Sequence, residues 1–173
     1  MTATPQGAPG PSAGGPDPND PVTWKIRQWE QILPGARFDR IGAAARIVHL
    51  GAELTKSMDR IARREGLSNQ DDYQVLSALR IETGPMTSTE LAARLVSTTA
   101  TVVNRIDRLE RLGYVRREPH PTDRRSIYVA ITDAGTACVE RTVIARTSER
   151  ERFLAALTDR QRDTLEKLLA KLG

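Results

Sequence analysis

The sequence contains very little cysteine and histidine. Among its 173 residues there are one cysteine, Cys138, and two histidines, so no disulfide can form within the chain. A structural metal site would need carboxylates to complete its ligand set, and we therefore predict neither a disulfide nor a metal or other cofactor. The sequence also has no run of eighteen apolar residues, which argues against a membrane-spanning helix and against a membrane partner.

The residue patterns that catalysis requires are missing as well. The sequence shows no nucleophile beside a base, no paired catalytic carboxylates and no glycine-rich phosphate loop. We expect His49 to line the core or a pocket, His120 to be solvated, and Cys138 to be a small buried apolar residue. The chain is therefore predicted not to be an enzyme.

The first twenty residues differ in composition from the rest of the chain. They hold five of the ten prolines and four of the twelve glycines, and we predict that residues 1–20 form a disordered tail. This stretch has neither the basic start nor the apolar run of a secretory signal, so a cytoplasmic location is expected. Residues 21–173 are long enough to bury one core and are predicted to form one domain.

Apolar residues recur at helical spacing through most of the remaining sequence. Capping boxes and helix-stop glycines divide this pattern into separate helices. The expected helices begin near Phe38, Ser68, Thr87, Ser97, Thr132 and Thr158. Between the fourth and the fifth, the spacing changes to the alternation of strands, over residues 114–118 and 126–131. The predicted fold class is mainly α with a small β-hairpin.

Two short helices followed by a hairpin are typical of a winged helix-turn-helix. In this fold the second helix enters the major groove of DNA and the hairpin, called the wing, reaches the neighbouring minor groove. From Arg94 to Arg125 there are eight arginines and four acidic residues, a basic excess typical of nucleic-acid contacts, although a solvated face would give the same count. We place the DNA-binding part at about residues 68–131.

Four stretches together resemble one family of regulators. They are Met86–Leu95, Ser97–Gly113, Asp123–Arg125 and Ile131–Gly135, and their combination is similar to the MarR family of transcription regulators. The resemblance implies a homodimer whose N- and C-terminal helices, about residues 36–65 and 132–172, intertwine. It also implies a double-stranded, pseudo-palindromic DNA operator as partner.

The same resemblance implies roles for single residues. Arg125 would enter the minor groove, Arg124 would assist or replace it, and Asp123 would support the wing. The residues expected in the major groove are Thr98, Thr99, Thr101, Asn104, Arg105 and Arg108. Some of these arginines could instead form salt bridges with Asp107 or Glu110.

A narrower resemblance concerns a small-molecule effector. Trp29 and the stretch 73–80 are similar to the urate-responsive branch of the family, which holds an anionic purine with a tryptophan, an aspartate and two arginines. Trp29, Arg105 and Arg117 match three of these positions, whereas Gln74 stands at the aspartate position. An anion between the two arginines would pull the DNA-facing helix inward, so a repressor released by a small anionic ligand is predicted. The alternative is that Trp29 anchors an extra N-terminal helix and the arginines bind only phosphate.

Other interpretations of the sequence stay open. A sequence-independent architectural DNA-binding protein would explain the arginines equally well, although Asn104 and the threonines favour sequence reading. A helical module that binds another protein would leave the wing arginines without a role. Redox sensing in the family commonly uses a cysteine of the first helix. Cys138 falls near the start of the fifth predicted helix instead, and a redox role for it is a further alternative.

Overall fold

The computed structural model describes residues 17, 20–38, 41–82, 84–120, 122 and 126–172. The chain divides into two compact units, residues 1–52 and residues 53–173. Among the described residues, no helix combines the length and the apolar character needed to cross a membrane.

The first unit contains α1 (Pro21–Ile32) and the first turns of α2 (Gly42–Arg64). Asp20 caps α1 by accepting a hydrogen bond from the Thr23 backbone N–H at 2.8 Å, and Pro21 follows in the first turn, where a missing N–H costs no hydrogen bond. The same carboxylate oxygen accepts a hydrogen bond from Arg46 of α2 at 2.8 Å. An extra N-terminal helix is therefore present, as one of the two interpretations of Trp29 expected.

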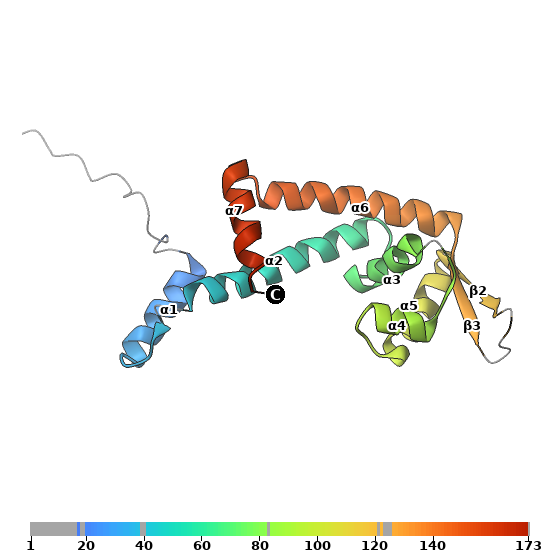
Figure 1. Ribbon diagram of the computed structural model, residues 1–173, viewed down its shortest axis with the longest axis horizontal. Helices are drawn as coiled ribbons and strands as arrows, with labels where there is room; N and C mark the ends of the chain where they lie inside the picture. The colour runs from blue at the N-terminus through green and yellow to red at the C-terminus, as the bar shows by residue number, and fades with distance from the viewer. Residues whose placement is uncertain are drawn as a thin grey trace, which may run out of the picture. The chain divides into compact units, whose positions relative to one another are not determined.

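The second unit holds the last turns of α2 and eight further elements (Figure 1). They are α3 (Gln70–Ile81), β1 (Met86–Thr87), α4 (Ser88–Arg94), α5 (Thr99–Arg111), β2 (Val115–Pro119), β3 (Ile127–Ile131), α6 (Asp133–Phe153) and α7 (Asp159–Leu169). Hydroxyl caps at Thr87, Thr132 and Thr158 begin α4, α6 and α7 where the sequence predicted these helices. The mainly α fold class with a small β part is confirmed.

The β part is a three-stranded sheet, whereas the sequence predicted a two-stranded hairpin. The order is β1-β3-β2 and both pairings are antiparallel, with Met86 opposite Val129 and Val115 opposite Ile131. The prediction missed β1 because two residues are too short to show an alternating pattern. This strand joins the wing, which is β2, β3 and the loop between them, to the start of α4.

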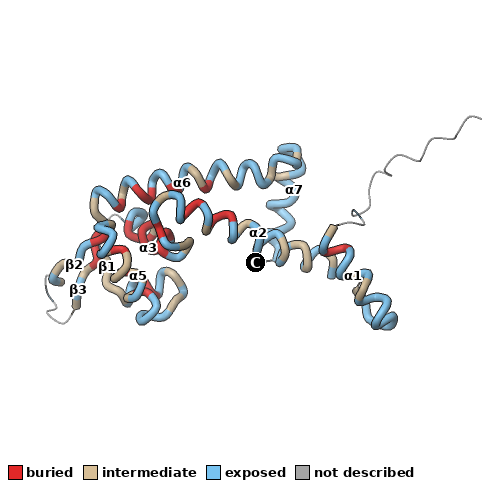
Figure 2. The backbone as a smooth tube through the Cα atoms, turned by 180° about the vertical axis from the view of Figure 1, so that it is seen from behind, coloured by how far each residue is buried: buried red, intermediate tan, exposed pale blue. Residues whose placement is uncertain are grey.

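The core of the second unit lies where α3, α4 and α5 meet the sheet. Leu76, Leu91 and Ile106 are fully buried, and the predicted inner face of α5 is buried as expected. In Figure 2 the buried segments of this unit lie in α3, in α5 and in the sheet. They continue into the last turns of α2, before α3, and into α6, after β3. The helix α6 also covers α3, because the guanidinium of Arg146 lies 4.1 Å from the centre of the Tyr73 ring.

A close approach of backbones fixes the start of α6. A side chain at Gly135 would place its Cβ 2.1 Å from the carbonyl oxygen of Tyr114, which is shorter than any real contact. The backbone N–H of Gly135 also donates to the capping hydroxyl of Thr132 at 3.1 Å. The glycine of the Thr-x-x-Gly sequence is therefore required by packing against the chain that leads into β2.

Candidate nucleic-acid interface

The N-terminus of α5 is formed by a hydroxyl cap. Thr98 accepts a hydrogen bond from the backbone N–H of Thr101 at 3.2 Å, and the two hydroxyl oxygens lie 2.8 Å apart. The sequence predicted a hydroxyl cap at the start of this helix, and the structure places it at Thr98. The Thr98 hydroxyl therefore already has a structural partner.

The exposed residues at the start of α5 are small and uncharged. The inner face consists of Val102, Ile106 and Leu109, which are all buried. The exposed residues of this end are Thr98, Thr99, Ala100, Thr101 and Asn104. Short hydroxyl, methyl and amide groups of this kind are the groups that contact base edges in a major groove.

Two of the predicted DNA-facing arginines form ion pairs with α3. Arg105 Nη2 lies 2.8 Å from Asp71 Oδ2, and the Arg105 side chain is only 15% exposed. Arg108 pairs with Asp72, whose side chain is completely buried. The hydrogen bond that Arg108 donates to the Asp72 carboxylate is the main cause of the raised pKa of Arg108. These ion pairs hold α5 against α3. That either arginine contacts DNA stays a prediction.

Arg117 of β2 carries a third set of ion pairs. Its guanidinium donates to Glu110 at 2.6 Å and to Asp107, both on α5. The hydrogen bond donated to Asp107 contributes most to the raised pKa of Arg117. The sequence left open that arginines of the DNA-facing set pair with these two acids. Among the described residues their partner is instead the wing strand, which ties the wing to α5.

The turn between α4 and α5 contains an unusual residue. Val96 has a φ of +48°, in the left-handed region that β-branched residues rarely adopt. Its side chain is 94% exposed. An exposed apolar side chain thus lies directly before the N-terminal end of α5, which we call its outer end.

The tip of the wing falls partly outside the described residues. Asp123, Arg124 and Arg125 belong to this part, so their assigned roles stay predictions. His120, which we expected to be solvated, is only half-exposed, and its ring centre lies 4.3 Å from that of Tyr128. The contact with Tyr128 accounts for this partial burial of the ring.

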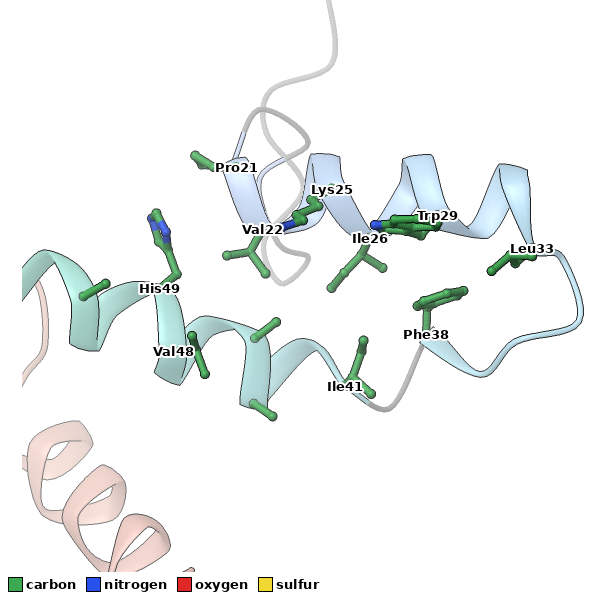
Figure 3. A pocket seen from close by; sticks show the side chains of 13 residues that line it. Pro21, Val22, Lys25, Ile26, Trp29, Leu33, Phe38, Ile41, Val48 and His49 are labelled. Carbon is green, nitrogen blue, oxygen red and sulfur yellow. The ribbon is translucent and has the colours of Figure 1, made fainter.

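The four predicted ligand residues lie in three different places. Trp29 lines an apolar groove of about 930 Å³ between α1 and α2, with Phe38 near it and His49 toward the other end (Figure 3). Gln74 and Arg105 line a separate cleft of about 370 Å³. Arg117 is on β2, in the ion pairs described above. Gln74 does lack a carboxylate, yet Asp71, one turn earlier on α3, supplies the acidic partner of Arg105.

The last candidate residues are the possible metal ligands, His49 and Cys138. Among the described residues, no group of three or more possible metal ligands occurs. His49 lines the groove, as one of its two expected positions. Cys138 is fully buried, and burial is the main cause of its raised pKa. A thiol of this kind is a poor nucleophile, which favours the expected packing role.

Comparison with known proteins connects this arrangement to one family. A model of the MarR family matches residues 65–126. An uncharacterised HTH-type transcriptional regulator of Mycobacterium leprae is 31% identical over 121 residues, which cover 67% of this chain and 85% of that protein. The HTH-type transcriptional regulator PecS of Dickeya dadantii is 24% identical over 149 residues, covering 85% of this chain and 89% of PecS.

A solved structure has the same fold. It is that of a mutant MarR from Escherichia coli complexed with operator DNA, with a TM-score of 0.64 and 24% identity. The match covers 83% of this chain and 96% of that chain.

Proposed function

The chain belongs to the MarR family of regulators, and from this premise we propose that it represses transcription by binding an operator sequence as a homodimer. Homodimers read pseudo-palindromic double-stranded DNA because their two-fold symmetry matches that of the site. The observation that carries this proposal is the outer end of α5, where exposed hydroxyl, methyl and amide groups follow the α4–α5 turn. A regulator of this kind performs no catalysis, and we propose a cytoplasmic location for it.

Within this proposal the parts of the chain have separate tasks. Residues of about 68–131 bind DNA, and the helices at about 36–65 and 132–172 hold the dimer. The outer face of α5 meets the major groove with Thr99, Thr101 and Asn104. Arg105 and Arg108 contribute to DNA binding by positioning α5, or directly if they leave Asp71 and Asp72. Arg125, with Arg124 beside it, enters the minor groove, and Asp123 supports the loop.

A gel-shift titration tests this function. The full chain is titrated against the intergenic DNA beside its own gene, at fixed salt and with excess nonspecific duplex. We expect binding that resists the competitor and is weakened by Arg125→Ala. Arg27→Ala is the matched control, since it removes the same charge from an exposed position of α1, outside the stretches assigned to DNA binding and to the dimer.

Equal binding to every duplex would instead support the architectural alternative. In that case the arginines neutralise phosphates only, and affinity falls steeply with salt for all sequences alike. Competitor-resistant binding to one intergenic sequence would contradict this alternative.

We also propose that a small anionic ligand releases the protein from its operator. The support is the cleft lined by Gln74, Arg94, Arg105 and Asp71. An anion that replaced Asp71 as the partner of Arg105 would act on the helix that meets DNA. Operator release is measured by gel shift with a panel of purines and small carboxylates, with Arg105→Gln as the variant expected to lose the response. Absence of release by every compound in the panel would contradict the ligand proposal and leave DNA binding untouched.

A further inference from the structure

We infer that the outer end of α5 selects A·T base pairs, through methyl contacts to thymine and through the Asn104 amide on adenine. The inference rests on the proposed function, because it concerns which bases a sequence-reading helix prefers. The structure places an uncharged methyl-rich and amide-bearing surface where the helix meets the groove, and it ties the nearby arginines to acids. Each of these features bears on the choice of base.

The arginines near this end are already paired. Guanine is read in the major groove chiefly by an arginine or lysine that donates two hydrogen bonds to its O6 and N7. Residues 88–106, all of which the structure describes, contain two basic residues, Arg94 and Arg105. Arg94 pairs with Glu82, and Arg105 pairs with Asp71 at 2.8 Å. Neither guanidinium is free to read guanine without losing a carboxylate partner.

Methyl groups occupy the surface instead. Ala100 and Thr101 are exposed, and the Thr101 hydroxyl lies 2.8 Å from that of Thr98, so the methyl group is the part of Thr101 without a partner. Val96 adds a third apolar side chain, 94% exposed, in the turn before the helix. Apolar side chains of this size distinguish thymine through its C5-methyl group, which no other DNA base carries in the major groove.

The position of Val96 supports a role on DNA. A left-handed backbone is strained for a β-branched residue, whereas glycine would adopt it without strain. Residues with a strained backbone cluster at functional sites, where the conformation serves the function. The strained conformation of the exposed Val96 therefore supports a role for its side chain that glycine could not fill.

Asn104 supplies the hydrogen-bonding partner for adenine. Its side chain is exposed on the same face as Ala100 and Thr101, one turn further along α5. It has no hydrogen-bond partner among the described residues, so both its donor and its acceptor are available. An asparagine amide can donate to adenine N7 and accept from adenine N6, a pair of bonds that guanine does not offer.

The experiment selects binding sites from a randomised duplex library with the full chain and measures affinities for the enriched sequence at fixed salt. We expect A·T pairs at the half-site positions nearest α5. Exchange of the adenine read by Asn104 for guanine should weaken binding about 5- to 150-fold, and Asn104→Ala should abolish most of this discrimination. Replacing the contacted thymine by deoxyuracil removes one methyl group and should weaken binding about fourfold.

A matched pair of variants tests the methyl contact. In Thr101→Ser the hydroxyl is kept and the methyl is lost, so deoxyuracil should no longer weaken binding at that position. Thr164→Ser makes the same change on α7 and should retain the full deoxyuracil effect.

Three results would contradict the inference, and they separate it from the proposed function. Enrichment of G·C pairs that depend on Arg105 would overturn it and leave sequence-specific binding intact. An A·T preference that is unaffected by deoxyuracil and by Asn104→Ala would mean that DNA shape is read instead of base edges. Enrichment of no sequence would contradict both the inference and the proposed function.

Discussion

The ion pair between Arg108 and Asp72 should contribute more to stability than the neighbouring pair between Arg105 and Asp71. Both pairs join α5 to α3, but Asp72 is completely buried, whereas the Asp71 side chain is 51% exposed. Besides Arg108, Asp72 accepts one hydrogen bond from the backbone N–H of Ser68 at 3.2 Å. Removal of the Arg108 guanidinium would leave a buried carboxylate without a cation.

The expected costs follow from these exposures. Loss of one partner of a buried ion pair costs about 3–5 kcal/mol, and we expect the lower end, about 3 kcal/mol, for Arg108→Met because the Arg108 side chain is 33% exposed and water can approach. Asp72→Asn leaves an arginine that can turn to solvent, so the loss of its charge-assisted hydrogen bond should cost about 1.5 kcal/mol. Arg105→Met, the matched control on the same two helices, should cost at most about 1 kcal/mol.

Urea unfolding at one fixed protein concentration measures these differences, since the stability of a dimer depends on concentration. The double variant Asp72→Asn/Arg108→Met closes a mutant cycle and should show a coupling above about 1 kcal/mol. The reasoning is refuted if Arg108→Met costs no more than Arg105→Met, or if the coupling is below about 0.5 kcal/mol.

Three further predictions concern packing, pH and the thiol. Gly135→Ala should destabilise the protein by about 3 kcal/mol in the same unfolding assay, because its Cβ would overlap the Tyr114 carbonyl; an unchanged unfolding midpoint would contradict the close approach. The pKa of Glu90 is lowered from 4.5 mainly by the backbone N–H of Thr87, so its contribution is present above that pH and is lost as the pH falls below it. Glu90→Gln should therefore flatten the fall of the melting temperature below pH 4.5, and an unaltered acid slope would contradict this assignment. Cys138 should react with a thiol reagent at neutral pH only after unfolding, and rapid reaction of the native protein would revive a redox role.

Features that depend on nearby residues could be predicted from the sequence, and features that depend on distant ones could not. The helix starts at Thr87 and Thr132 were predicted because each cap bonds to a residue only three positions away. The partners of Arg105 and Arg108 were not predicted, because they lie 34 and 36 residues away in the sequence, whereas Asp107 and Glu110 are close to both arginines on the same helix. The strand β1 was missed for the same reason, since only its pairing with β3 makes it a strand.

The pairing of β1 with β3 has a consequence for the spacing of contacts along DNA. Met86 pairs with Val129 of the wing, and the next residue, Thr87, caps α4, so the wing cannot slide past the helix that precedes the reading helix. One extra base pair between the bases met by α5 and those met by the wing would shift the second contact by about 3.4 Å and turn it by roughly 35° around the duplex. In the proposed mode of binding, each half of the operator would therefore keep a constant number of base pairs between its two contacts, whereas the dimer would set the distance between the halves separately.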